Sequence, residues 1–106
     1  MSDEILVVLS TFGSAEEARK VCRQLVEERL VACANLLPAV ESIYRWQGGV
    51  ETATETMALM KTTVAGYAKL EARLQQLHSY SVPEIVALPV RSGAESYLGW
   101  IGENVE

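Results

Sequence analysis

Few side chains in this sequence could act as a nucleophile or bind a metal ion. The 106 residues contain one histidine, His78, and two cysteines, Cys22 and Cys33. Cys22 falls on the apolar stripe of a predicted helix. Cys33 lies in a predicted strand, where packing at a subunit seam is the favoured role. Because these positions favour packing over reactivity, we expect the protein not to be an enzyme.

Two aromatic residues, Tyr44 and Trp46, could form a contact surface. They are two positions apart, so both project from the same face of a predicted hairpin. A contact between subunits is the favoured role, and a platform on which a ligand stacks is the alternative.

Charged residues on the strand that follows could line a pocket at a subunit border. Glu51, Glu55 and Lys61 are separated by even numbers of residues, so in a strand they lie on the same face as apolar residues. Charged and apolar side chains on one face predict a polar site at the edge of a buried surface. A structural network of ion pairs is an equally good interpretation. The residues predicted to line this interface pocket are Tyr44, Trp46, Glu55, Lys61, Tyr80 and Glu84.

Length, composition and charge limit the class of protein. We expect a single domain spanning residues 1–106, because 49% of the residues are hydrophobic and 22% are charged. The net charge of −5 disfavours binding to nucleic acid or to an anionic membrane surface. The longest aliphatic run is only five residues, 5–9, too short to cross a membrane. We therefore expect a soluble, cytoplasmic protein with both cysteines reduced.

Hydrophobic periodicity and turn residues predict an α+β fold. Ser14 and Glu17 form a capping-box signal, Pro38 marks a bulge, and Gly48-Gly49 predicts a two-residue hairpin turn. The predicted elements are a strand at 4–12, a helix at 15–30, hairpin arms at 31–47 and 50–63, a helix at 64–78, a strand at 84–90 and a helix at 94–104. The order βαββαβ is the ferredoxin-like arrangement, here with an added C-terminal helix.

The strands predict that the chain associates with other copies. Residues 5–9 and 85–88 are apolar on both parities, so both faces of the sheet must be shielded from water. Each Val, Leu or Ile left in water forfeits roughly 1.5–3 kcal/mol, against a net stability of about 5–15 kcal/mol. A 17-residue arm at 31–47 would also extend on the order of 55 Å and overhang the domain. A homo-oligomer is the simplest partner.

Several functions of the ferredoxin-like fold lack their usual residues. The third strand has no aromatic residue for RNA stacking, and the first loop has neither a cysteine pair for a soft metal nor an arginine for phosphate. A PII-type sensor would need a basic phosphate cradle, and Lys61, Lys69 and Arg91 are scattered. That possibility has weak support but stays open.

Five separated blocks resemble the CutA family of divalent-cation tolerance proteins. They are LVACAN at 30–35, SIYRWQG at 42–48, KTT at 61–63, HSYSVPEI at 78–85 and YLGWI at 97–101. The resemblance implies a ferredoxin-like subunit in a PII-like homotrimer that is linked to tolerance of copper and other divalent metals.

The family's metal residues carry over only in part. Some members have a cysteine at the end of the first strand and two adjacent histidines at the end of the second helix. The matching positions here are Ser10, Leu77 and His78. His78 with Glu84 therefore predicts only weak binding of copper or another divalent cation, because tight sites need several ligands. A helix-end role, in contact with the helix dipole, is the favoured interpretation of His78.

Three functions remain after these considerations. The first is a homotrimer in metal-ion tolerance, which binds divalent metal weakly and has no catalytic reaction. The second is a PII-like sensor whose subunit clefts hold an anionic metabolite near Lys61, Tyr80 and Glu84. The third is a trimeric scaffold for a partner protein.

Overall fold

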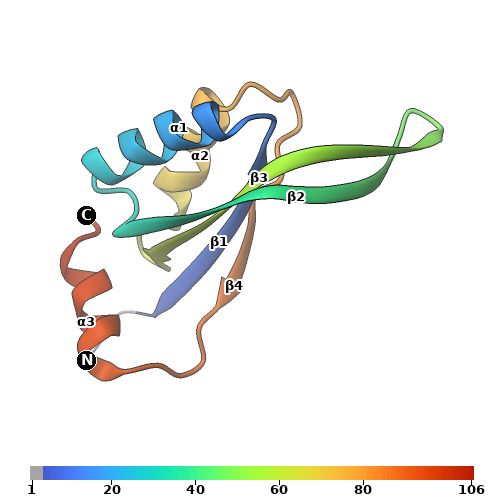
Figure 1. Ribbon diagram of the computed structural model, residues 1–106. Helices are drawn as coiled ribbons and strands as arrows, with labels where there is room; N and C mark the ends of the chain where they lie inside the picture. Colours follow the sequence, from blue (N-terminus) through green and yellow to red (C-terminus); the bar gives the residue numbers. More distant parts are fainter. Residues whose placement is uncertain (1–3) are drawn as a thin grey trace.

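The computed structural model describes residues 4–106, which form four strands and three helices. The sheet order is β2-β3-β1-β4, and every neighbouring pair is antiparallel. Helices α1 and α2 lie together on one face of the sheet, and α3 lies at its lower end (Figure 1). The predicted ferredoxin-like α+β fold is confirmed. The elements are β1 (Ile5–Phe12), α1 (Ala15–Glu27), β2 (Cys33–Trp46), β3 (Gly49–Thr63), α2 (Tyr67–Leu77), β4 (Val86–Pro89) and α3 (Glu95–Glu103).

The hydrophobic core lies between the two helices and the sheet. Val8 and Phe12 of β1 are fully buried against Leu25 of α1 and against Leu70 and Leu74 of α2. The stripe predicted for α1 is buried except at its last position, where Val26 is 39% exposed. A smaller cluster under α3 contains Ile5, Ala32 and Ile101.

Helix α1 begins as predicted and ends earlier than predicted. Ser14 Oγ accepts a hydrogen bond from the Glu17 backbone N–H at 3.1 Å, which is the expected N-cap. The Glu17 carboxylate does not complete a capping box; it bonds instead to the backbone N–H and the hydroxyl of Ser79. The helix stops at Glu27 because Arg29 has a positive φ of 62°, which a right-handed helix does not accommodate.

The hairpin of β2 and β3 is built around one bulge and one tight turn. The register shifts between Leu37 and Val40, so the bulge predicted at Pro38 is confirmed. The predicted turn residues were one position too late, because Trp46 pairs with Gly49 and the turn consists of Gln47 and Gly48. Their φ angles of 49° and 85° are both positive, as a tight primed turn requires.

The outer half of this hairpin projects beyond the rest of the chain as an arm (Figure 1). The molecule measures 47 × 25 × 22 Å, so the predicted overhang is present. Side chains near its end are open to solvent, with Ile43 69% and Val50 67% exposed. The arm therefore presents apolar surface that the chain itself does not cover.

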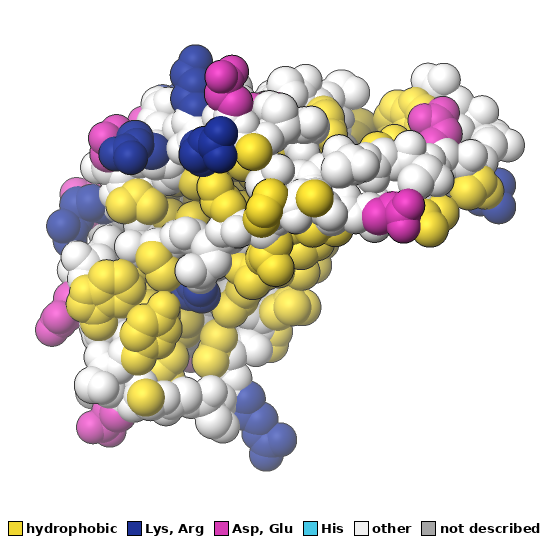
Figure 2. All heavy atoms as spheres, in the orientation of Figure 1, with side chains coloured by type: hydrophobic (Ala, Val, Ile, Leu, Met, Phe, Trp, Pro, Cys, Tyr) yellow, Lys and Arg dark blue, Asp and Glu magenta, His cyan; other side chains and the backbone are white. Residues whose placement is uncertain are grey.

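The sheet surface that faces away from α1 and α2, called here the outer face, is apolar. In the strand register Leu9 lies between Leu59 of β3 and Val86 of β4, and Val7 lies between Leu88 of β4 and Lys61, the charged residue on this part of β3. Val86 and Leu88 are 47% and 48% exposed. Figure 2 shows hydrophobic side chains gathered over β1 and β4 below the arm. The predicted apolar character of both sheet faces is confirmed.

The later elements are shorter than predicted. Helix α2 begins at Tyr67, because a turn in which the Gly66 N–H bonds to the Thr63 carbonyl precedes it. Strand β4 covers only Val86–Pro89. Within residues 4–106, no helix combines the length and the apolar character needed to cross a membrane.

Both cysteines are unpaired, as predicted, and burial raises the pKa of the Cys22 thiol from its usual 9.0 to about 11.

In a Cys33→Ser variant at pH 8, we expect Cys22 to react with iodoacetamide about a hundredfold more slowly than a thiol of ordinary pKa, since only the thiolate reacts. The rate should rise with pH until about pH 11. Mass spectrometry follows the reaction, and the protein unfolded in guanidinium is the control. Equal rates in the folded and unfolded protein would contradict this burial.

Candidate functional site

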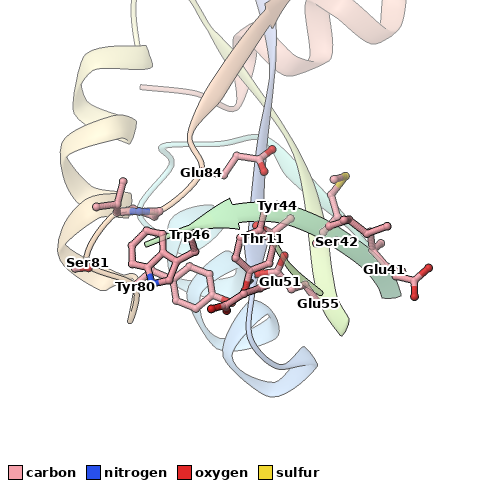
Figure 3. Close-up of a pocket in the computed structure, with 15 residues that line it drawn as sticks. Thr11, Glu41, Ser42, Tyr44, Trp46, Glu51, Glu55, Tyr80, Ser81 and Glu84 are labelled. Carbon is pink, nitrogen blue, oxygen red and sulfur yellow. Dashed lines mark hydrogen bonds between the residues drawn. The ribbon is translucent and has the colours of Figure 1, made fainter. Parts of the chain in front are cut away.

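A cavity of about 770 Å³ lies where the hairpin arm meets the body of the protein. Its walls come from the arm, from the end of β1 at Thr11, and from the loop of residues 80–84 that follows α2. Figure 3 shows the side chains that line it. The volume falls within the range of roughly 300–1,000 Å³ that is typical of small-molecule sites.

Strand alternation and register bring the lining side chains together. Tyr44 and Trp46 share one face of β2, and Glu51 lies directly opposite Tyr44 on β3. Glu55 lies opposite Val40, just beyond the bulge. Because paired residues of an antiparallel ladder project to the same side, these aromatic rings and carboxylates face one cavity.

The cavity is acidic. Among residues 4–106, its lining contains the carboxylates of Glu41, Glu51, Glu55 and Glu84 and no lysine, arginine or histidine. Tyr80 Oη donates a hydrogen bond of 2.6 Å to Glu55 Oε2. Partial burial, followed by this bond to Glu55, raises the pKa of Tyr80, so the phenol stays a donor.

His78 ends α2 and holds the loop that carries Tyr80. Its ring Nε2 donates to the Thr11 carbonyl at 2.8 Å, and Nδ1 accepts the Tyr80 backbone N–H at 3.1 Å. The tautomer is assigned from these partners, because an amide N–H can bond only to a nitrogen without a proton. The side chain is fully buried, and its ring stacks on Phe12 with centroids 4.5 Å apart. Both ring nitrogens are therefore occupied.

A family model described as CutA1 divalent ion tolerance protein matches residues 6–104. The chain belongs to this family. It is 52% identical over 98 residues to the divalent-cation tolerance protein CutA of Thermus thermophilus, which covers 92% of this chain and 95% of that protein.

Two plant proteins of the CutA1 family are also similar. The crystal structure of CutA1 from Oryza sativa superposes with a TM-score of 0.96 at 31% identity and covers 99% of this chain and 96% of that one. The chloroplastic protein CutA of Arabidopsis thaliana is 35% identical over 91% of this chain, which spans 53% of that protein's length.

The CutA1 fold brings together five of the six residues predicted for the interface pocket. Tyr44, Trp46, Glu55, Tyr80 and Glu84 line the cavity. Lys61 does not, because it lies six residues along β3 from Glu55, about 20 Å in an extended strand. It donates instead to Asn35 Oδ1 on β2. Sequence reasoning missed Glu41 as a lining residue, because its parity on β2 differs from that of Tyr44.

The candidate metal positions of this CutA1 chain do not form a ligand cluster in the described residues. Ser10 is buried in the core, and its Oγ has no hydrogen-bond partner among the described residues. Leu77 packs against the core, and Glu84 is exposed at the cavity. In the described part of the chain, no group of three or more His, Cys, Asp or Glu side chains is placed to hold a metal ion. The ring of His78 bonds to β1 rather than to the last carbonyls of its own helix, where the helix-end interpretation had placed it.

The two bonds of the His78 ring predict one tautomer. We expect long-range ¹H–¹⁵N spectra at pH 8 to show Nε2 protonated and Nδ1 bare, because Nε2 donates to Thr11 and Nδ1 accepts from Tyr80. Since His78 is the one histidine of the sequence, its signals need no assignment variant. A proton on Nδ1 in the folded protein would contradict this network.

Proposed function

We propose that this CutA1 family member acts in tolerance of divalent metal ions as a homotrimer whose neighbouring subunits cover the outer face of the sheet. The tolerance role is supported by relatives that are named divalent-cation tolerance proteins. The observation that carries the assembly is the exposure of Val86 and Leu88 beside Val7 and Leu9 on one continuous apolar surface. Leaving such side chains in water costs roughly 1.5–3 kcal/mol each, a large part of a domain's stability.

The same proposal gives copper and other divalent cations only weak binding. For His78 to bind a metal ion, its ring must give up the Thr11 carbonyl or the Tyr80 N–H. Leaving such a buried group unpaired costs about 1–3 kcal/mol. Glu84 alone offers one carboxylate at an exposed position. A copper ion would therefore find few ligands at either place, and tight binding needs several.

The metabolite-sensor alternative has less support. An anionic ligand would meet four carboxylates in the cavity, and Lys61 lies about 20 Å from Glu55 along β3. The charge of the lining therefore favours a cation.

Nothing in the described residues favours the scaffold function in particular. The unpaired state of Cys22 and Cys33 supports a cytoplasmic location.

Calorimetric titration with copper(II) tests the metal proposal. We expect wild-type protein to bind with a dissociation constant weaker than roughly 1 μM, because residues 4–106 contain no preformed ligand cluster. Glu84→Gln should weaken this binding further, whereas Glu27→Gln, an exposed change on α1, should leave it unchanged. Stoichiometric binding far below 1 μM would contradict the proposal of weak binding.

A charge on the outer face tests the assembly. Leu88→Lys places an ammonium group among apolar side chains at a residue that is 48% exposed in a single chain. We expect this variant to dissociate toward 11.6 kDa by light scattering, because a buried unpaired charge is strongly unfavourable. The matched control is Val26→Lys, at a 39% exposed position on α1. If the Leu88→Lys and Val26→Lys variants had the same mass in solution and the same melting temperature, the proposal that neighbouring subunits cover the outer face would be wrong.

A further inference from the structure

The cavity beside the arm is built for a positively charged ligand. Its lining within residues 4–106 carries four carboxylates and no basic side chain. The net charge of the whole chain, −5, adds to this potential. An occupant must therefore supply the positive charge itself.

The shape of the cavity favours an organic cation over a bare metal ion. Its volume of about 770 Å³ far exceeds the space of a coordinated ion. Described carboxylates do not converge into a cluster of three ligands, and Glu55 already accepts the Tyr80 hydroxyl. A metal ion would have to disturb that bond, whereas a larger cation can use the carboxylates where they stand.

Aromatic rings form much of the remaining wall. Figure 3 shows the rings of Tyr44, Trp46 and Tyr80 beside the carboxylates of Glu51 and Glu55, while Glu84 lies apart. Tyr44 pairs with Glu51 across the hairpin, so a ring and a carboxylate are immediate neighbours. Faces of Trp and Tyr attract cations by roughly 0.5–1 kcal/mol at exposed sites. Rings and carboxylates thus select the same kind of ligand.

We infer that this cavity binds a protonated organic amine, with its N–H groups donating to Glu51 and Glu55 and its charge resting against Trp46 and Tyr44. Carboxylates accept hydrogen bonds and do not donate them, which matches an ammonium group. Apolar wall residues such as Val82 and Pro83 suit the carbon chain of the amine. His78 is outside the lining, so the amine does not use that residue as a ligand.

The test is an NMR titration of the wild-type protein with 1,4-diaminobutane in 0.15 M salt, which screens non-specific attraction. Two neutral or anionic compounds of the same chain length, 1,4-butanediol and succinate, serve as ligand controls. We expect the diamine alone to shift the Trp46 indole N–H saturably. Trp100, on α3 and outside the cavity, supplies an internal reference that should not move.

Variants of the lining separate the two parts of the site. Glu51→Gln and Trp46→Leu should each weaken diamine binding about two- to fivefold, and Trp46→Phe should retain most of it because the ring remains. The Trp46 variants are followed through the shifts of backbone amides at the cavity. Glu27→Gln removes the same charge from exposed α1 and should leave the affinity unchanged.

Several results would overturn the inference. They are an absence of any shift with diamine, equal shifts of both indoles, equal weakening by Glu27→Gln and Glu51→Gln, or saturable binding of succinate. If a neighbouring copy fills the cavity in the assembled protein, the diamine will not bind and the inference fails in the same way. A failure here would leave the metal-tolerance proposal standing, because that proposal rests on family membership and on the outer face.

Discussion

The sheet of this protein is apolar on both faces, and its own helices cover only one of them. Val8 and Phe12 turn toward α1 and α2, while Val7 and Leu9 turn the other way with Leu59, Val86 and Leu88. Among the described residues 4–106, no further element covers that second face, since α3 lies at the lower end of the sheet. Association between copies is the simplest way to remove this surface from water, and it accounts for the overhanging arm as well.

The cavity follows from the same geometry. Because β2 and β3 run past the end of β1, their lining face is left to meet the loop after α2 rather than another strand. That loop is held by Glu17, which bonds to Ser79, and by His78, whose ring joins the Thr11 carbonyl to the Tyr80 N–H. His78, the single histidine of the chain, therefore links β1 to the loop after α2 beside the acidic cavity. Both of its ring nitrogens are bonded within the protein, and the proposal of weak metal binding rests on those two bonds.

Local signals in the sequence were enough to predict the element order, the Ser14 cap, the Pro38 bulge and the apolar outer face, because each depends on neighbours in the chain or on period-two spacing. Two glycines, at 48 and 49, left the turn position ambiguous, and only the pairing of Trp46 with Gly49 decides it. Shared parity placed Lys61 and Glu55 on one face but gave no distance between them. The partners of His78 come from β1 and from its own following loop, so no spacing in the sequence could reveal them.

The covered outer face is the claim on which the assembly depends, and sedimentation velocity of the wild-type protein over a wide range of concentrations tests it most directly. The account predicts one species near three times the chain mass of 11.6 kDa, persisting on dilution to the micromolar range. A folded, cooperatively melting species of 11.6 kDa would mean that the outer face is stable in contact with water, and would contradict the account.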